Sequence, residues 1–350
     1  MKKIFLALVV FLCSVLTLSA RPARVWVEAE SFVRKGGWNV DQQFTFEMGS
    51  PYLIAHGMGN PVEDASTRVH FPRKGTYHIY VRTFNWTSPW SEQEGPGRFT
   101  LSIDGKPLCQ TIGHTGNRWM WQYAGTATVD KEAEVSLHDL TGFDGRCDAL
   151  WFTTDKDDIP PTEAGALETF RQRYDKSRIR HVEYDFVVVG GGIAGICASV
   201  AAARMGIKVA LINDRPIWGG CNSSETRVHL GGHIEMEPYP NLGNMIKEFG
   251  PLRIGNAQPA EFYEDEKKRA FLEAEKEHLD LYPSYRVYKT DCRNGKITAV
   301  YARHIESGEI VRFQAPIYSD CTGDGTVGYL AGADFAMGRE GRNEYNEPSA

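Results

Sequence analysis

The 350-residue sequence is 42% hydrophobic and 24% charged, so it holds enough apolar material for two folded domains. Its formal net charge of -6 is spread along the chain without a basic stripe, which argues against nucleic acid as a partner. The cysteines form no CxxC pair and have no His-Cys ligand spacing, so we expect no metal site of the zinc type.

The first twenty residues form a separate segment. Two lysines precede an apolar run that reaches Leu18, and the small residues Ser19 and Ala20 follow. This order is typical of a secretory signal peptide, with a retained membrane anchor as the alternative. We therefore expect residues 1–20 to be cleaved on export, to the periplasm of a Gram-negative bacterium or to the outside, leaving no membrane span.

Residues 21–155 have the pattern of an all-β domain. Short alternating runs, such as 77–82 and 99–103, are separated by turn residues, which predicts a β-sandwich. Cys109 and Cys147 either form a disulfide in this domain or remain free thiols. Residues 156–180 are charged, contain two adjacent prolines and include a short helical pattern, so they are predicted to be a linker.

A dinucleotide-binding fingerprint follows the linker. An apolar strand at 184–189 leads into Gly190, Gly192 and Gly195 in G-x-G-x-x-G spacing, and an Ala-rich helix at 193–205 begins within that motif. Gly190 permits a sharp turn, Gly192 lets a pyrophosphate approach the helix, and Gly195 lets helix and strand pack closely. The amides of the first helical turn, beginning with Ile193 and Ala194, are expected to face the phosphates.

The second strand of this unit, at 208–212, ends without the usual carboxylate. Asn213 stands where an acidic residue would bind the adenosine ribose, and Asp214 is its neighbour. Either Asn213 makes a weaker contact with the ribose, or Asp214 reaches it. Both are therefore candidate cofactor residues.

A second glycine turn distinguishes a flavin from a nicotinamide cofactor. A strand at 315–319 leads into the turn residues Thr322, Gly323, Asp324 and Gly325, and a helix of small residues follows. Such a turn is similar to that of the glutathione-reductase-like flavoproteins, where its aspartate binds a ribityl hydroxyl. A plain acidic loop is the alternative.

Two long runs carry a wider resemblance. LINDRPIWGGCNSSETRVHLGG (211–232) and DCTGDGTVGYLAGADFAMGRE (320–340) resemble secreted FAD-dependent oxidoreductases of polysaccharide-degrading bacteria, some described as related to xanthan lyases. VEAESF, GSPYLIAHG and LHDLTGFDGRCDAL resemble the carbohydrate-binding-like sandwich that precedes them. The resemblance implies noncovalent FAD, with residues near the pyrophosphate and flavin at Gly219, Gly220, Ser223, Ser224 and Glu225. The resemblance places Arg227 just beyond these residues. The sequence departs from the family pattern at Cys221, where Asn is expected.

The residues of this stretch allow several roles. Gly219 and Gly220 permit close backbone approach and the following polar residues can donate to phosphate, although a surface loop is the alternative. Arg227 either places positive charge beside the flavin or forms a solvated salt bridge. His229 is the candidate proton acceptor for an alcohol substrate. No metal is expected at His229, His233 and Glu235, because Leu-Gly-Gly between the histidines is a poor helix.

Aromatic residues are dense in the predicted sandwich. They are either a platform for a sugar or part of the core. The residues concerned are Trp86, Trp90, Trp119, Trp121 and Tyr123. The charged stretch 261–278 is predicted to be an amphipathic helix without a chemical role.

Together these patterns predict a multidomain protein, with an all-β sandwich followed by an α/β Rossmann-like FAD-binding domain of glutathione-reductase type at 181–350. The apolar periodicity is still running at Ala350, so this domain is expected to be truncated. We expect an exported FAD-dependent oxidoreductase that acts on a sugar or related alcohol, with a small molecule or glycan as substrate. The alternative is a carbohydrate-binding protein with an inactive or structural flavin domain. A polysaccharide lyase has no support, because no lyase domain is evident.

Overall fold

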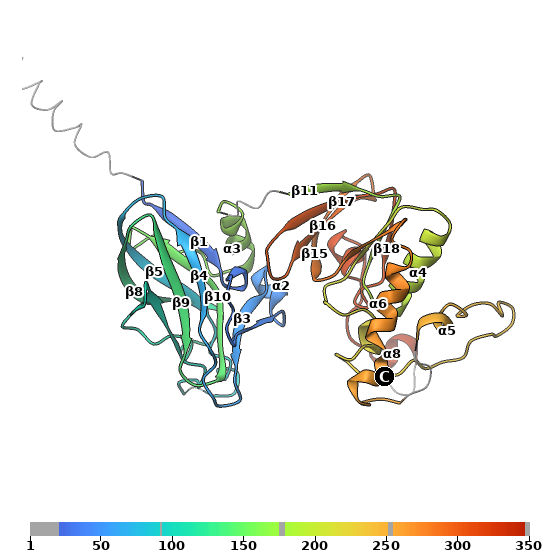
Figure 1. Ribbon diagram of the computed structural model, residues 1–350, viewed down its shortest axis with the longest axis horizontal. Coiled ribbons are helices and arrows are strands. Elements are labelled where there is room, and N and C mark those ends of the chain that lie inside the picture. Colours follow the sequence, from blue (N-terminus) through green and yellow to red (C-terminus); the bar gives the residue numbers. More distant parts are fainter. Residues whose placement is uncertain (1–20, 92, 175–178, 251–254, 347–350) are drawn as a thin grey trace, which may run out of the picture. The chain divides into compact units, whose positions relative to one another are not determined.

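The computed structural model describes residues 21–91, 93–174, 179–250 and 255–346. The predicted signal peptide lies outside these residues. The chain divides into two compact units, one ending at Lys176 and one beginning at Ser177 (Figure 1). Within the described ranges, no helix combines the length and apolarity needed to cross a membrane.

The first unit is built from two antiparallel sheets. One sheet has the strand order β2-β3-β10-β5-β8, with β1 also paired to β10, and the other has the order β4-β9-β6-β7. The strands of the first sheet are β1 (Arg24–Glu28), β2 (Asn39–Asp41), β3 (Tyr52–His56), β5 (Gly75–Thr83), β8 (Met120–Val129) and β10 (Phe143–Thr153). Those of the second are β4 (Ala65–His70), β6 (Phe99–Ile103), β7 (Lys106–Pro107) and β9 (Glu132–Asp139).

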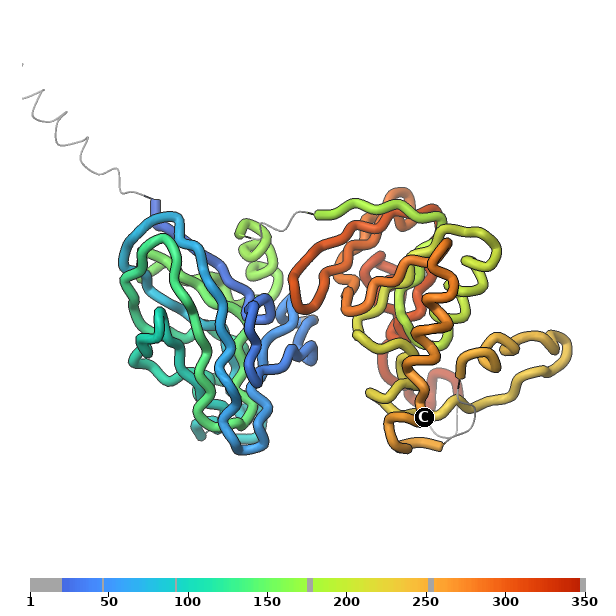
Figure 2. Tube along the Cα trace, in the orientation of Figure 1, coloured from blue at the N-terminus to red at the C-terminus, as the bar shows by residue number. Residues whose placement is uncertain are grey.

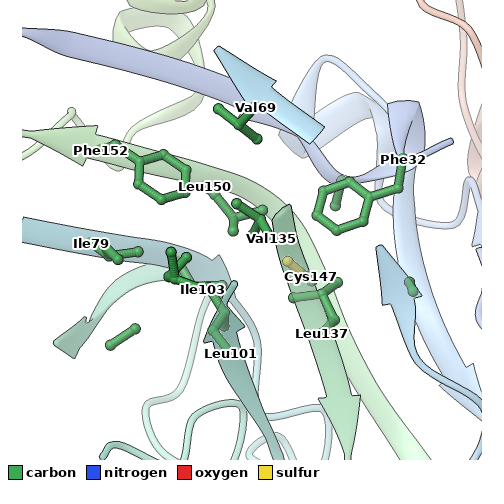
Figure 3. Close-up of a cluster of buried hydrophobic side chains, with 14 of the residues drawn as sticks. Phe32, Val69, Ile79, Leu101, Ile103, Val135, Leu137, Cys147, Leu150 and Phe152 are labelled. Carbon is green, nitrogen blue, oxygen red and sulfur yellow. The ribbon is translucent and has the colours of Figure 1, made fainter. Parts of the chain in front are cut away.

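The core of this unit lies between the two sheets. Alternate residues of β6 and β9 are buried, as expected for strands with one face packed and one face exposed. Leu101 and Val135 from one sheet meet Ile79 and Phe152 from the other in a single apolar cluster (Figure 3). The alternating runs in the sequence therefore do form the two faces of a sandwich.

The segment predicted to be a linker contains a helix that belongs to the first unit. Helix α3 (Ala164–Arg171) places Leu167 against Trp121 and Trp151, in a second apolar cluster. Its last residue, Arg171, is fully buried and forms ion pairs with Asp148 and Glu28. The helix is held to the sandwich by both apolar and charged contacts, which is why it does not behave as an exposed connection.

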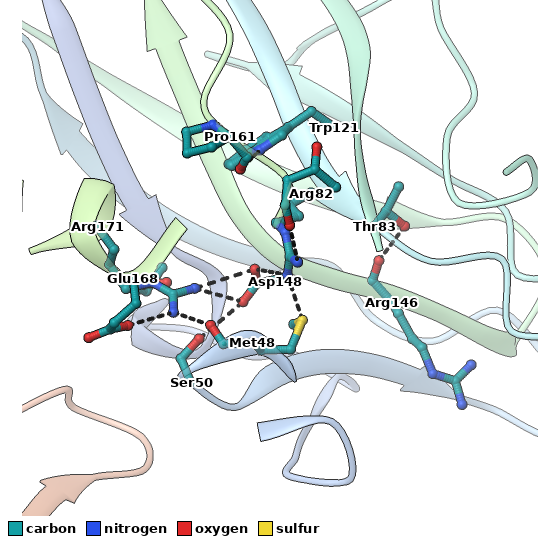
Figure 4. A network of polar contacts seen from close by, with 12 residues as sticks. Met48, Ser50, Arg82, Thr83, Trp121, Arg146, Asp148, Pro161, Glu168 and Arg171 are labelled. Carbon is teal, nitrogen blue, oxygen red and sulfur yellow. Dashed lines mark hydrogen bonds and ion pairs between the residues drawn. The ribbon is translucent and has the colours of Figure 1, made fainter. Parts of the chain in front are cut away.

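The buried charges under α3 form one network (Figure 4). Asp148 lies 2.9 Å from Arg82 and 3.3 Å from Arg171, and the side chains of all three are almost completely buried. Arg171 also pairs with Glu28 at 2.8 Å. Two short elements of the unit, η1 (Ala29–Ser31) and α2 (Thr45–Met48), contribute Glu30 and Met48 to the same region.

The disulfide that we considered between Cys109 and Cys147 is not formed. Both cysteines are free, with Cys147 buried in the sandwich core and Cys109 exposed. Burial raises the pKa of the Cys147 thiol well above its usual value, so this side chain behaves as a small apolar core residue.

The second unit contains a parallel sheet and a mixed sheet. The parallel sheet has the order β14-β13-β12-β18, and in the mixed sheet, of order β11-β17-β16-β15, only β11 and β17 run parallel. The parallel strands are β12 (Phe186–Val189), β13 (Val209–Ile212), β14 (Leu279–Tyr282) and β18 (Ile317–Asp320). The strands of the mixed sheet are β11 (Arg180–Glu183), β15 (Tyr285–Arg293), β16 (Lys296–His304) and β17 (Ile310–Gln314).

Helices cover the parallel sheet and connect its strands. Helix α4 (Ile193–Arg204) links β12 to β13 and packs on both, as the Ala-rich sequence predicts. The charged stretch 261–278 forms η3 (Ala260–Tyr263) and the shorter helix α6 (Asp265–Glu273). The remaining helices are η2 (Gly220–Asn222), α5 (Ile246–Phe249), α7 (Thr326–Leu330) and α8 (Arg342–Tyr345). The segment around α5 leaves the body of this unit (Figure 2).

Candidate functional site

The two glycine turns of the sequence lie side by side at the carboxyl edge of the parallel sheet. Strands β12 and β18 are parallel neighbours, with Val189 opposite Asp320. Directly beyond them, the Cys321 amide donates to the Val189 carbonyl at 2.7 Å. A Cβ atom at Gly190 would lie 2.2 Å from the Cys321 carbonyl oxygen, so only glycine permits this approach. The fingerprint and the acidic turn therefore meet at one edge, which is where ligands bind in open α/β sheets.

The amino end of α4 fits a diphosphate group. Gly192 precedes the helix, and no side chain caps the first helical amides. A Cβ atom at Gly192 would meet nothing within 4 Å, whereas one at Gly195 would lie 1.8 Å from the Gly190 carbonyl oxygen. Gly195 is thus needed for packing and Gly192 leaves open space beside Ile193 and Ala194. Uncapped amides facing open space are the usual binding site for phosphate at a helix amino end.

A second glycine pair lies against this helix end. Gly219 forms a parallel bridge with Gly192, and its amide donates to the Gly191 carbonyl at 2.8 Å. A Cβ atom at Gly220 would lie 3.0 Å from the Gly192 Cα atom. Gly219 and Gly220 also have positive φ values of 122° and 57°, which favour glycine. The loop that starts here is part of the same edge.

The polar residues of this loop have different surroundings. The Ser223 hydroxyl donates to the Gly220 carbonyl at 2.7 Å, so it stabilises the turn. The Ser224 amide donates to Asp265 of α6, and Glu225 and Cys221 are exposed. Asn222 donates to the Val228 carbonyl, while its buried Oδ1 atom accepts no hydrogen bond within the described structure.

The acidic turn is held in place by a residue that we did not single out from the sequence. Asp320 accepts hydrogen bonds from Thr322 with one oxygen and from the amides of Val327 and Gly328, in α7, with the other. This leaves Asp324 exposed between Gly323 and Gly325, which both have positive φ. The arrangement leaves the Asp324 side chain exposed while Asp320 fixes the backbone of the turn.

Asn213 has a structural role. Its Oδ1 atom accepts from the Gly191 amide at 3.1 Å, and its Nδ2 atom donates to the carbonyls of Arg215 and Ile217. An amide has both functions, whereas a carboxylate could not donate to these carbonyls. The Asn213 side chain is therefore engaged in internal hydrogen bonds, and the half-buried Asp214 is its acidic neighbour at this strand end.

A buried lysine packs against the loop that begins at Gly219. Lys268 of α6 is fully buried, and its stem would lie 3.0 Å from a Cβ atom at Gly219. Its ammonium group donates to the Tyr263 carbonyl and lies 3.7 Å from Asp265, and burial lowers its pKa. The helix to which we assigned no chemistry thus shapes the site. The only signal was the periodic position of Lys268 on the face that carries Leu272.

The candidate catalytic residues lie in the loop after the glycine pair. His229 has its Nδ1 atom 2.7 Å from the Asn256 Oδ1 atom. Arg227 is exposed and has a φ of 59°, and its backbone is fixed because its carbonyl accepts from Tyr263 at 2.6 Å. Glu235 pairs with Lys247. Among the described residues no group of His, Cys, Asp and Glu could hold a metal ion.

The aromatic residues of the sandwich separate into two classes. Trp119 and Trp121 are buried in apolar clusters and are core residues. Trp90 is 79% exposed and Tyr123 is 43% exposed. Trp86 is half-buried and lies 6.5 Å from Trp90, centroid to centroid, with the rings at 69°.

A parallel sheet, a glycine turn at the amino end of α4 and a second glycine turn beside it define a dinucleotide-binding α/β unit. Residues 185–350 match the family model described as FAD dependent oxidoreductase. This part of the chain is therefore an FAD-dependent oxidoreductase domain, and FAD is its cofactor.

Other known proteins match parts of the chain. The aerobic glycerol-3-phosphate dehydrogenase of Staphylococcus aureus is 39% identical over 67 residues, which are 19% of this chain and 12% of that enzyme. A family 35 carbohydrate binding module from Clostridium thermocellum matches at a TM-score of 0.30 and 15% identity, over 37% of this chain and 96% of that one. L-proline dehydrogenase from P. horikoshii matches at a TM-score of 0.26 and 18% identity, over 42% of this chain and 24% of that one. The matched stretch thus spans about an eighth of the curated relative.

Proposed function

We propose that the protein is an exported FAD-dependent oxidoreductase that oxidises a sugar or a related alcohol, with the sandwich binding glycan. The observation that carries the proposal is the meeting of the Gly190–Gly195 turn and the Asp324 turn at one sheet edge. A polyol phosphate is the substrate named for the staphylococcal dehydrogenase, which supports an alcohol as substrate class. Export rests on the signal-peptide pattern of residues 1–20.

The chain's own groups would hold the cofactor through its polar half. The amides of Ile193 and Ala194, together with the glycine pair Gly219 and Gly220, would contact the diphosphate. The Asp324 carboxylate would accept a hydrogen bond from a ribityl hydroxyl. Bound FAD supplies a two-electron acceptor for the hydride of an alcohol.

His229 is proposed as the base that takes the alcohol proton. Because the Asn256 Oδ1 atom only accepts hydrogen bonds, His229 Nδ1 must carry the hydrogen of the 2.7 Å contact. In the neutral imidazole the lone pair is then on Nε2, the form that a general base requires. Loss of the proton from the hydroxyl accompanies loss of hydride from its carbon, so the alcohol becomes a carbonyl. Arg227, two residues away, would supply positive charge to the reduced cofactor.

The sandwich is proposed to bind glycan through Trp90 and Trp86. An exposed indole can stack on the C–H face of a sugar ring, and the neighbouring Trp86 ring, inclined at 69°, would form the second side of such a platform. The Trp86 Nε1 atom donates to the Phe143 carbonyl at 3.0 Å, which fixes its ring. Small molecules and glycans are therefore the proposed partners.

The colour of the purified protein tests the first part of the proposal. We expect a yellow protein that releases FAD on denaturation, and anaerobic bleaching of its absorbance by a panel of sugars and polyols. A colourless protein that takes up no added FAD would contradict the proposal. Protein that binds FAD and is reduced by dithionite, but by none of the alcohols, would instead support a carbohydrate-binding protein with a structural flavin domain.

A further inference from the structure

A buried tyrosine lies behind the loop that carries His229. Tyr263 is the last residue of η3, and its side chain is fully buried. Its hydroxyl oxygen lies 2.6 Å from the Arg227 carbonyl, 3.2 Å from the Gly255 carbonyl and 3.3 Å from the Gln258 amide. A hydroxyl has one hydrogen to donate, so it donates to the nearer Arg227 carbonyl and accepts from the Gln258 amide. This hydroxyl therefore joins the loop of Arg227 to the segment that ends at Gln258.

The joined segment contains Asn256, which contacts His229. The Ala257 amide also donates to the Arg227 carbonyl, at 2.9 Å, so the backbone next to Asn256 is fixed. The Asn256 Oδ1 atom lies 3.0 Å from the His229 amide nitrogen and 2.7 Å from its Nδ1 atom. Because a backbone amide can only donate, the atom that faces it is the oxygen of Asn256, and the same oxygen requires a hydrogen on Nδ1.

Helix α6 holds the backbone of Tyr263. The ammonium group of the buried Lys268 donates to the Tyr263 carbonyl. Leu272 of the same helix packs in the apolar cluster of the parallel sheet. The tyrosine is therefore fixed relative to the body of the second unit, and its hydroxyl bonds fix the two loop segments to it.

We propose that Tyr263 is a positioning residue for proton transfer at His229. Its hydroxyl holds the segment that presents the Asn256 Oδ1 atom, and this oxygen keeps the neutral His229 in the Nδ1–H form. The lone pair on Nε2 then takes the alcohol proton, and the resulting imidazolium still donates to Asn256 through Nδ1. Tyr263, which is fully buried, acts through Asn256. The inference rests on the proposed role of His229 as the base.

The tautomer of His229 tests this inference without a substrate. Long-range proton–nitrogen correlation spectra of the full chain with isotope-labelled histidine are recorded at about pH 8.5, where an ordinary histidine is neutral. His229→Gln assigns the signals, and the parent protein should show the Nδ1–H form. Tyr263→Phe keeps the ring but removes the hydroxyl, so this form should be lost in favour of mixed tautomers. Asn256→Ala should cause the same loss, whereas Asn256→Asp, which keeps an acceptor oxygen, should retain the Nδ1–H form.

Tyr285 supplies the matched control. It is also a buried tyrosine of the second unit, and its hydroxyl donates to Glu309 at 2.6 Å. Tyr285→Phe should therefore leave the tautomer of His229 unchanged. An Nδ1–H form that persists in Tyr263→Phe would overturn the inference, and so would its loss in both tyrosine variants. A parent protein without the Nδ1–H form would overturn the proposed base as well.

Flavin reduction gives the catalytic readout. With an alcohol that bleaches the parent protein, Tyr263→Phe should lower the limiting rate of reduction about tenfold, part of the ~100-fold or more that a positioned base contributes. The alcohol concentration at half the limiting rate and the rate of reduction by dithionite should stay the same. Equal limiting rates in Tyr263→Phe and the parent protein would overturn the positioning role. A parent protein that no alcohol reduces would contradict the proposed function, while the tautomer in Tyr263→Phe still decides the role of Tyr263.

Discussion

Substitutions at single glycines should distinguish effects on FAD binding from effects on folding. A Cβ atom at Gly192 meets no other atom, and its φ of -71° suits any residue, so Gly192→Val leaves the fold intact. The new side chain fills the space beside the helix amides. FAD affinity should therefore fall at least tenfold, which is a loss of about 1.4 kcal/mol of binding free energy. Fluorescence titration measures the affinity and thermal unfolding of the FAD-free protein measures the fold.

The matched control is Gly195→Ala. Its Cβ atom would lie 1.8 Å from the Gly190 carbonyl, so this variant should lose stability without FAD, by about 1–3 kcal/mol. Equal FAD affinity in Gly192→Val and the parent protein would show that phosphate does not approach α4 here.

Glu30 gives a pH-dependent stability to the first unit. Its burial raises its pKa well above the ordinary value of 4.5, with Glu28 and Asp148 adding to the effect and Arg171 opposing it. The folded state therefore holds a proton that the unfolded state has lost, and stability falls as the pH rises from about 4.5 toward the raised pKa. Glu30→Gln should remove this loss.

Urea unfolding from pH 4 to pH 8 checks the prediction. The gain of Glu30→Gln over the parent protein should grow with pH, and a gain that is the same at every pH would contradict it. Glu47, which is exposed on α2, is the control position, and Glu47→Gln should change neither the stability nor its pH dependence.

At the scale of elements, α6 supports the cofactor loop through one buried cation. Lys268→Met keeps the stem beneath Gly219 but removes the donor to the Tyr263 carbonyl, which should cost about 1–3 kcal/mol of stability. The loop from Gly219 should then exchange amide hydrogens faster and FAD should bind more weakly. Hydrogen exchange with mass spectrometry measures the first effect.

Lys267 offers the neighbouring control. It is 49% exposed and pairs only at 3.7 Å with Glu264, so Lys267→Met should have no effect on exchange in the loop. If both variants behave alike, Lys268 does not support the loop.

The regular elements of the second unit follow from the sequence because local signals agree there. The apolar runs and the spacing of Gly190, Gly192 and Gly195 predict β12, α4 and β13 to within two residues. The contacts of individual side chains could not be predicted in the same way. The backbone groups that bond to the Asn213 side chain are positioned only by the folded turn. The Asp320 carboxylate accepts from amides of the turn and helix that follow it, and a local pattern does not reveal this role.

Elsewhere the sequence carried weaker signals. Helix α3 has the composition of an ordinary linker. Its burial depends on the ion pairs that Arg171 forms with Asp148 and Glu28, which are distant in sequence. The segment around α5 has no strong periodicity, and Met236, Tyr239 and Leu242 are exposed there. Such a stretch could not be assigned from local pattern because its apolar residues do not define one face.

At the scale of the whole molecule, the two units should bind different ligands. Trp90→Ala removes the most exposed indole and should abolish retention of the protein on polysaccharide, while FAD affinity stays the same. Affinity electrophoresis in gels with soluble polysaccharides measures retention.

Trp119 serves as the buried comparison. It packs on Phe44, Tyr52 and Phe84, so Trp119→Ala should destabilise the sandwich by about 3–5 kcal/mol. Retention that is unaffected by Trp90→Ala would remove the proposed platform.

Titration of the flavin-free full chain with FAD and with FMN addresses the dinucleotide site itself. If the two glycine turns receive one ligand, FAD binds with a stoichiometry of about one per chain, and FMN, which lacks the adenosine half, binds far more weakly. Absence of FAD binding, or equal affinity for FMN, would contradict a site formed jointly by these turns.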